Sequence, residues 1–213
     1  MGPLAEPGRD CPLCPRLVDY LAASRAAHPD WHNAPVPSFG PLSARLLIVG
    51  LAPGLRGANR TGRPFTGDHA GDLLYDTLAR FGFAKGVDGA DADDGFSLID
   101  CRITNAVRCV PPENKPIAAE VNACRPFLES EIAAMADLRV ILCLGRLSHN
   151  AVLRVLGLGQ SAAKFTHGAL HDGLLDGVAL ADSYNCSRYN TNTGRLTATM
   201  FDGVFAGIRA RLD

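Results

Sequence analysis

Four of the seven cysteines are placed where they could share one metal centre. Cys11 and Cys14 form a C-x2-C pair, and Cys109 and Cys124, separated by 14 residues, follow much further along the chain. Thiolates two residues apart can bind a metal from a single turn, and the distant pair then closes a large loop that restricts the unfolded chain. Tetrahedral zinc and a [4Fe–4S] cluster both accept four thiolates, so the ligand set alone leaves both open. Four ordinary thiols are the alternative.

The remaining cysteines have different surroundings. Cys101 and Cys143 lie inside apolar runs, where a free cysteine acts as a small hydrophobe, and we expect both in the core. Cys186 stands in a polar stretch and has no predicted role. An odd number of cysteines at these spacings does not resemble a secreted disulfide framework.

A glycine-rich segment follows the first apolar run of the chain. Residues 50–74 read GLAPGLRGANRTGRPFTGDHAGDLL. Glycines at this density allow backbone amides to approach a ligand closely, above all an anionic one. The segment has neither the GxxxxGK[ST] pattern of a Walker A loop nor the GxGxxG spacing of a dinucleotide loop.

The elements that must position these segments alternate between strand and helix. The apolar runs predict strands at 45–50, 97–104, 138–144 and 178–183, and the helical patterns lie at 71–81, 116–135, 147–156 and 198–212. Such alternation predicts an α/β fold with a mainly parallel, four-stranded sheet flanked by helices, and ligands bound beyond the carboxyl ends of the strands. We expect a single domain over 1–213, with two of the cysteines on an N-terminal segment, 1–40.

Composition and charge narrow the class of protein. A hydrophobic content of 47% is sufficient for one well-buried core. A net charge of −1 gives no global attraction to nucleic acid, so any DNA contact must be local. We see no apolar run of membrane-spanning length and no signal-peptide core, and we expect a cytoplasmic, nucleoid-associated monomer with no membrane partner.

Four motifs in order carry a family resemblance. They read GLAPG, GRPFTGD-x-AG, TNAVRCVPP and SY-x-x-SR-x-NT-x-TGRLT, and with the four cysteines they extend over 11–197. The set resembles the iron–sulfur branches of the uracil-DNA glycosylase superfamily, most closely its family 5. The resemblance implies hydrolysis of the N-glycosidic bond of uracil, and of other deaminated bases such as hypoxanthine or xanthine, to leave an abasic site. It also implies a [4Fe–4S] cluster rather than zinc at the cysteines.

The resemblance also implies which residues receive the base. A base inside a duplex must be flipped into a pocket, stacked and read along its Watson–Crick edge. Phe65 is the expected stacking ring, and the amide of Asn105 can donate and accept at once to the base. The backbone of the first loop completes the predicted set: Gly50, Ala52, Pro53 and Gly54. The alternatives are a core phenylalanine and an asparagine that only makes a turn.

Three further residues are candidates for chemistry. Leu51 occupies the place of a polar residue used in family 1, which assigns the water-orienting carboxylate to Asp68. An aspartate here can equally cap the following helix, and both roles are compatible. Asn185 stands where the family typically has a histidine that donates to the O2 atom of the departing base. His167 is the candidate to compensate for that change.

The segment from Ser183 to Thr197 is predicted to contact DNA. Phosphate contacts are expected from this loop and from the first one. The predicted residues are Arg56, Arg60, Arg63, Ser187, Arg188, Asn190 and Arg195. No lysine occurs in the pocket motifs, so no Schiff base and no strand cleavage are expected.

Two other functions stay open from the sequence. The first is a catalytically weakened DNA-binding relative, which the asparagine at 185 favours. The second is a metal-stabilised hydrolase of free nucleotides, which cleavage of free deoxyuridine in preference to an oligonucleotide would support.

Overall fold

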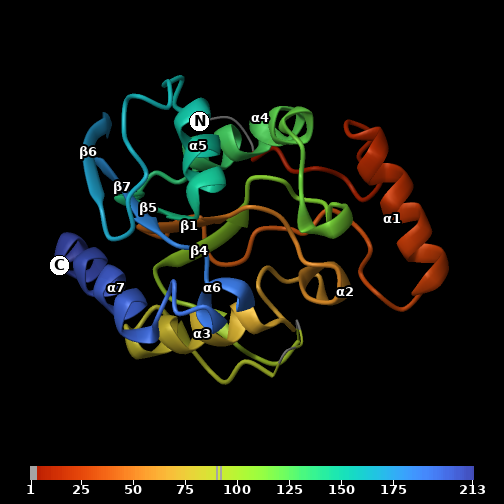
Figure 1. The fold of residues 1–213 in the computed structure, drawn as a ribbon, viewed down its shortest axis with the longest axis horizontal. Coiled ribbons are helices and arrows are strands. Elements are labelled where there is room, and N and C mark those ends of the chain that lie inside the picture. The colour runs from red at the N-terminus through yellow and green to blue at the C-terminus, as the bar shows by residue number, and fades with distance from the viewer. Residues whose placement is uncertain (1–3, 90, 92) are drawn as a thin grey trace.

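The computed structural model describes residues 4–89, 91 and 93–213 of the chain (Figure 1). Its helices are α1 (Pro15–Ala27), α2 (Ala58–Thr61), α3 (His69–Arg80), α4 (Ala118–Ala134), α5 (Arg146–Val155), α6 (Arg188–Asn192) and α7 (Ala198–Leu212), with a 3-10 turn at Pro112–Asn114. Its strands are β1 (Leu46–Gly50), β2 (Ala84–Lys85), β3 (Ser97–Leu98), β4 (Cys101–Asn105), β5 (Val140–Leu144), β6 (Leu170–Leu175) and β7 (Val178–Ser183). The predicted α/β class is confirmed.

The central sheet has the strand order β4-β1-β5-β7-β6. The first four strands are parallel to their neighbours, and β6 pairs antiparallel with β7 at the edge. The prediction of four strands was wrong by this edge strand, whose residues are mostly exposed or half-buried. An edge strand of that composition lacks the continuous apolar run of a buried parallel strand.

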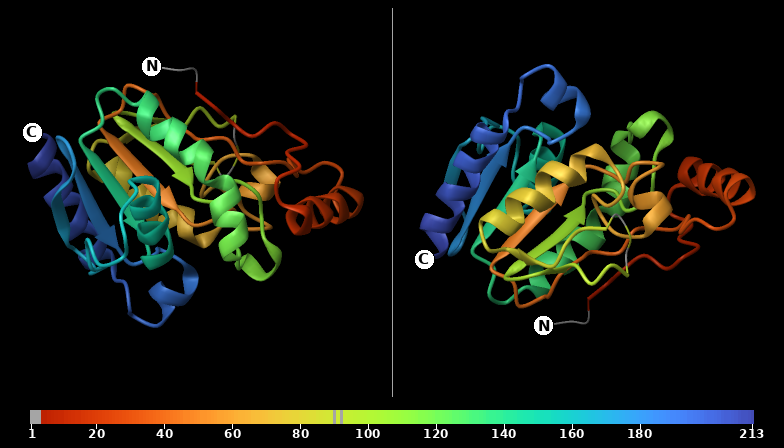
Figure 2. Two further views of the ribbon diagram at one scale, coloured as in Figure 1. Left: turned by 90° about the horizontal axis from the view of Figure 1, so that it is seen from above. Right: turned by 90° about the horizontal axis from the view of Figure 1, so that it is seen from below.

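The two faces of the sheet are covered by different helices (Figure 2). Alternate residues of β1 point to opposite faces, as in any strand. Leu46 and Ile48 belong to one core with side chains of α3 and α7, and Leu47 and Val49 belong to a second core with side chains of α4 and α5. All four helices were predicted from the sequence within two residues at each end.

The second predicted strand is broken in the structure. Residues 97–98 form the short β3, which pairs with β2, and the central strand β4 begins only at Cys101. Asp100 separates them with a left-handed backbone (φ 53). Its carboxylate accepts a hydrogen bond from the backbone amide of Arg45 (2.8 Å) and pairs with the Arg45 guanidinium (2.6 Å), which holds the turn in place.

The N-terminal segment packs on the loop that follows β4. Leu17 and Leu21 of α1 share a small core with Val107 and Val110. Asn33 and Asn59 add a buried hydrogen bond between this segment and α2 (2.9 Å). No helix in the described part of the chain has both the length and the apolar character needed to cross a membrane.

Candidate active site

A cavity of about 310 Å³ opens at the carboxyl ends of β1 and β4. Five of the predicted base-binding residues line it, namely Ala52, Pro53, Gly54, Phe65 and Asn105. Asp68, Asn185 and Ser187 reach it from α3 and from the loop after β7. We refer to this cavity as the base pocket. Its volume lies at the small end of the range of ligand sites, about 300–1,000 Å³.

Asn105 presents an unpaired acceptor to the base pocket. It is the last residue of β4 and only 3% exposed, and in the described structure its Oδ1 is buried without a hydrogen-bond partner. A buried amide oxygen without a partner costs free energy, on the order of 1–3 kcal/mol. Such an atom at the wall of a cavity indicates a donor that arrives with a ligand.

Gly50 keeps the base pocket open between Asn105 and Phe65. It pairs with Asn105 across the parallel strands β1 and β4. A Cβ atom at this position would collide with Asn105 Oδ1 and would lie 2.8 Å from Phe65 Cζ. Gly50 is not among the described residues that line the base pocket. Any side chain at this position would occupy the space between Asn105 and Phe65.

Phe65 is held in an unfavourable backbone conformation. Its φ of 56° is left-handed, which is unusual for a bulky residue and costs on the order of 1–3 kcal/mol. Gly71 permits this turn, because a Cβ atom there would collide with the Phe65 carbonyl oxygen. The half-buried Phe65 side chain borders the base pocket, so this strained turn places an aromatic ring at the cavity.

Asp68 serves two purposes with its two carboxylate oxygens. Oδ1 caps α3 by accepting from the backbone amides of Ala70 (3.0 Å) and Gly71 (3.2 Å). Oδ2 faces Gly54 and Gly57, and the Cβ atom that Gly54 lacks would lie 3.1 Å from it. Burial raises the pKa of this carboxyl group, and the two amide hydrogen bonds oppose that rise. Both predicted roles of Asp68 are therefore compatible with the geometry.

Asn185 lies in the wall between the base pocket and a second depression. The second depression, which we call the flanking groove, has a volume of about 420 Å³, and Asn185 lines both. Asn190 holds this part of the loop by donating from Nδ2 to the Asn185 carbonyl oxygen (2.8 Å). The polar residue that replaces the expected histidine thus borders the cavity as the sequence predicts.

His167 lies in the flanking groove and not in the base pocket. Its Nδ1 accepts from the Tyr184 amide (3.1 Å), and its ring stacks on the Tyr184 ring at 4.8 Å. Burial lowers the pKa of this imidazole. The structure therefore does not bring His167 together with Asp68 and Asn105 as a direct catalytic partner.

The four predicted metal ligands converge on one small apolar cavity. Cys11, Cys14, Cys109 and Cys124 all line it, beside Leu17 and Phe127. Burial, together with the neighbouring thiols, raises the pKa of Cys109 to about 12.

Comparisons with known proteins agree with the site. The sequence model of the uracil DNA glycosylase superfamily matches residues 37–209. A type-5 uracil-DNA glycosylase of Thermus thermophilus is 46% identical over 197 residues, which cover 90% of this chain and 89% of that protein. The chain belongs to the uracil-DNA glycosylase superfamily. The type-5 enzyme of Mycobacterium leprae is 43% identical over 92% of this chain and 88% of its own length, and that of Pyrobaculum aerophilum is 40% identical over 88% and 83%.

Membership of this superfamily confirms the enzyme class that the sequence predicts, a DNA glycosylase, and its resemblance to the type-5 branch. A type-4 uracil-DNA glycosylase of Pyrobaculum aerophilum is more distant, at 35% identity over 67% of this chain and 65% of that protein.

One predicted DNA contact of this glycosylase is wrong. Arg63 is 3% exposed, and its guanidinium pairs with Asp88 and Asp94 at 2.7 Å each. The rings of Phe39 and Phe96 lie within 5.5 Å of the guanidinium carbon. The charge is neutralised and enclosed, so Arg63 anchors an acidic loop instead of a phosphate. Four other predicted arginines are exposed, namely Arg56, Arg60, Arg188 and Arg195.

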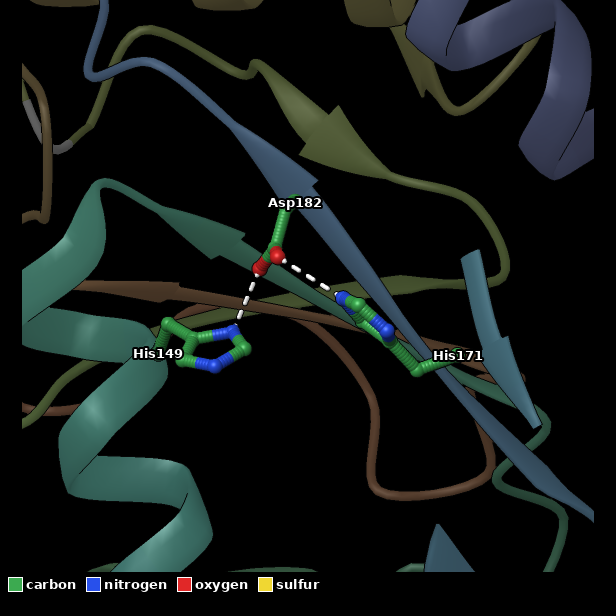
Figure 3. Close-up of side chains that lie close together, drawn as sticks. All are labelled: His149, His171 and Asp182. Carbon is green, nitrogen blue, oxygen red and sulfur yellow. Dashed lines mark hydrogen bonds and ion pairs between the residues drawn. The ribbon is translucent and has the colours of Figure 1, made fainter. Parts of the chain in front are cut away.

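A buried ionic network supports the loop that carries Asn185 (Figure 3). Asp182, near the end of β7, lies between two imidazole rings: it accepts from His149 Nδ1 (2.7 Å) and from His171 Nε2 (3.0 Å). The Thr166 amide is a third donor (3.3 Å), and His149 Nε2 faces the Ala163 carbonyl oxygen (3.1 Å). The network joins α5, β6 and β7, and both oxygens of Asp182 have hydrogen-bond partners.

Sequence reasoning missed several residues of the glycosylase site. Leu51, Ala58, Ala70 and Asn114 also line the base pocket. Asn114 follows Pro111 and Pro112, and it and Glu113 both have left-handed φ angles (56° and 54°). Asparagine tolerates that conformation, so the pattern of two prolines followed by Asn was the available signal. The partners of Asp182 left no local signal, because they come from distant elements.

The remaining cysteines pack in the core. Cys101 and Cys143 are completely buried, as predicted. Cys186 is also completely buried, although its sequence surroundings are polar. Burial and the charge of Asp68 raise its pKa to about 12, and the side chain packs in the core shared by α3 and α7.

Proposed function

We propose that this glycosylase removes uracil from DNA by hydrolysing the N-glycosidic bond, and leaves an abasic site. The observation that carries the proposal is the buried, unpaired Oδ1 of Asn105 in a cavity bordered by Phe65 and Asp68. A flipped base would stack on Phe65 and present its Watson–Crick edge to Asn105.

The Asn105 amide supplies the base selectivity. Uracil has an N3–H donor for Oδ1 and an O4 acceptor for Nδ2, whereas cytosine has an acceptor at N3 and a donor at N4. Cytosine would therefore leave both amide atoms opposed to atoms of the same kind. Hypoxanthine and xanthine have the same N–H and carbonyl pair as uracil, so the same amide also favours these deaminated purines.

Asp68 supplies the carboxylate for hydrolysis. Oδ1 is occupied by two amides of α3, so Oδ2 is the oxygen that holds water. The C1′–N1 bond breaks and its electron pair leaves with the base, while the water oxygen bonds to C1′ and gives up a proton to Asp68 or solvent. A carboxylate beside the sugar also stabilises the positive charge that develops there.

Asn185 would help the base to leave. The negative charge of the departing base spreads to O2, and an amide N–H at the rim of the base pocket can donate to it. A neutral amide cannot give a proton, so this step is weaker than with an imidazolium. None of the described residues that line the base pocket is a lysine, which favours attack by water and no covalent Schiff-base intermediate.

The four cysteines fit a [4Fe–4S] cluster. Four thiols that converge on one small cavity supply the number of ligands that such a cluster needs, and the family resemblance favours the cluster over zinc. Such a cluster would tie the N-terminal segment to the loop after β4, where Cys109 follows Asn105 by four residues. Purified protein should absorb near 400 nm and contain iron and sulfide. Zinc in their place would refute this assignment.

Release of base from an oligonucleotide tests the function. A single-turnover assay with excess enzyme should release uracil from uracil-containing DNA and leave free deoxyuridine intact. Tight binding of the oligonucleotide without release of base would instead favour the DNA-binding relative, for which Asn185 is the specific support. A borohydride-trapped covalent adduct would contradict attack by water.

A further inference from the structure

A group of three buried, charged side chains joins β4 to α4. Arg102 of β4, Arg108 of the loop after β4 and Glu131 of α4 are 6%, 2% and 0% exposed. Glu131 divides its carboxylate between the two arginines: Oε1 accepts from Arg102 Nε (2.7 Å), and Oε2 accepts from Arg108 Nη2 (2.8 Å). We refer to these three residues as the arginine triad.

The arginine triad carries an excess of positive charge. Two guanidinium groups share one carboxylate, and in the described structure neither of them has a second carboxylate partner. Their further acceptors are the neutral carbonyl oxygens of Gly40 and Val36. The Arg108 Nε atom is buried and has no hydrogen-bond partner among the described residues. A buried charge is strongly unfavourable unless an opposite charge compensates it, so the triad indicates a negative group nearby.

Arg108 connects the arginine triad to the predicted metal ligands. It precedes Cys109 in the chain, and its backbone N–H donates to Cys124 Sγ (3.4 Å). Cys124 and Glu131 are seven residues apart in α4, which is about two turns, so they lie on the same face of the helix. Burial raises the pKa of the Cys124 thiol, and the amide and the guanidinium of Arg108 oppose that rise. The charge of the triad therefore acts on the cysteine site.

The other described charges that act on these cysteines are balanced. Glu120 is a buried acid beside them, and the Arg16 guanidinium pairs with its two oxygens at 2.7 and 2.9 Å. Arg25 adds positive charge, and Asp10 pairs with it at 2.7 Å. Neither pair offsets the excess charge of the arginine triad.

A metal bound by four thiolates would supply the missing negative charge. Four thiolates carry four negative charges, and a zinc ion or an oxidised [4Fe–4S] core cancels two of them. The complete centre is then a dianion, whereas four protonated thiols are neutral. Backbone N–H groups and charges around the ligand sulfurs are the usual means by which a protein stabilises such a centre.

We propose that the arginine triad is the counter-charge of a dianionic metal–tetrathiolate centre at the four cysteines, and that Arg108 delivers it through its guanidinium group and its backbone N–H. The proposal rests on the four-cysteine centre of the proposed function and not on base excision. It applies to an iron–sulfur cluster and to zinc alike, because both centres have the same charge. Arg108 would act on the sulfur ligands without binding the metal.

The test separates the charge of Arg108 from its contacts. Arg108→Met and Arg108→Lys both remove the guanidinium group and keep the backbone N–H to Cys124, but only the lysine variant keeps the charge. The measured quantity is the rate at which the purified, metal-loaded protein loses its metal to EDTA under argon. Iron loss is followed by absorbance near 400 nm, and zinc loss by a zinc-binding dye.

We expect Arg108→Met to lose its metal about tenfold faster than the unmodified protein, because a partly buried charge near an ion of opposite sign is worth about this factor or more. Arg108→Lys should stay within about twofold of the unmodified protein. If the Arg108 variants do not fold, Arg102→Met and Arg102→Lys give the same comparison at the other arginine, and we expect a smaller difference in the same direction.

Two outcomes would overturn the proposal. An unchanged rate in Arg108→Met would show that the metal centre does not need the charge. Equally fast loss in Arg108→Met and Arg108→Lys would show that the contacts of the guanidinium group matter and its charge does not. Protein purified without air that holds neither iron nor zinc would refute the metal centre and this proposal together. Release of uracil by that same protein would leave base excision standing.

Discussion

The base pocket and the Asp182 network are two buried polar sites that differ in how their polar atoms are paired, and the segment from Asp182 to Asn185 connects them. In the network, both oxygens of a buried carboxylate have donors, from His149, His171 and the Thr166 amide. In the base pocket, the Asn105 oxygen is equally buried but has no partner. A buried polar atom costs more free energy without a partner than with one, so we interpret the first site as structural and the second as a site for a ligand.

The largest expected effect is on stability, at the paired site. His149→Ala removes a donor from a fully buried carboxylate, and the free energy of unfolding should fall by about 3–5 kcal/mol. For a chain of this length, each 1 kcal/mol lowers Tm by roughly 2–4 °C, as measured by calorimetry. His171→Ala is the comparison, because its ring is partly exposed and should cost less. Equal losses in the free energy of unfolding would show that the greater burial of His149 does not make it more important for stability than His171.

In the base pocket, where the Asn105 oxygen is unpaired, we expect a substitution to lower the rate of the reaction and to leave stability nearly unchanged. Asn105→Ala should lower the single-turnover rate of uracil release by about 10²–10³, because the base loses its donor and acceptor. Stability should change little, since the removed oxygen has no partner in the protein. Asn122→Ala, on the exposed surface of α4, is the control for the substitution. A large loss of Tm in Asn105→Ala would show that the amide is structural.

The two roles of Asp68 can be separated by one substitution. Asparagine is as good a helix cap as aspartate, so Asp68→Asn should keep α3 and Tm but lower the rate by about 100-fold. Asp68→Ala should lower the rate and also cost about 1 kcal/mol of stability. Similar rates in Asp68→Asn and the unmodified enzyme would leave Asp68 as a cap alone.

The pH dependence of the rate follows from the same carboxyl group. Burial raises the pKa of Asp68 above its ordinary value of 3.8. If the carboxylate is the active form, the rate is complete above the raised pKa and falls as pH drops through it. The acid limb of single-turnover rate against pH should therefore lie above pH 3.8 and be absent in Asp68→Asn. An acid limb that persists in the variant would belong to another group.

The smallest effect is expected at the wall of the base pocket. Asn185→His restores a side chain that can carry a proton toward the departing base, and should raise the rate of uracil release by about tenfold, or about 1.4 kcal/mol of barrier. Asn192→His, exposed at the end of α6, is the control. An unchanged rate in both would show that position 185 does not act on the leaving group.

Local patterns were sufficient for much of the fold. The apolar runs and helical periodicities located four strands and four helices, because burial repeats along the chain with the period of each element. They did not reveal β6, whose exposed residues lack such a pattern, nor the interruption of a predicted strand at Asp100.

The sequence by itself determined the α/β class, the four cysteines, the position of Phe65 and Asp68 on the loop after the first strand, and that of Asn105 where the next central strand ends. The tertiary structure decided which polar groups are paired with other residues and which are available to a ligand. Arg63 pairs with Asp88 and Asp94, which lie 25 and 31 residues away, and Asp182 receives His149 from 33 residues away. A charge contacts DNA only if the fold leaves it exposed and without a partner. Whether a charged side chain is exposed or paired depends on distances between elements that are far apart in the sequence. The periodicity of residues along the chain does not reveal those distances.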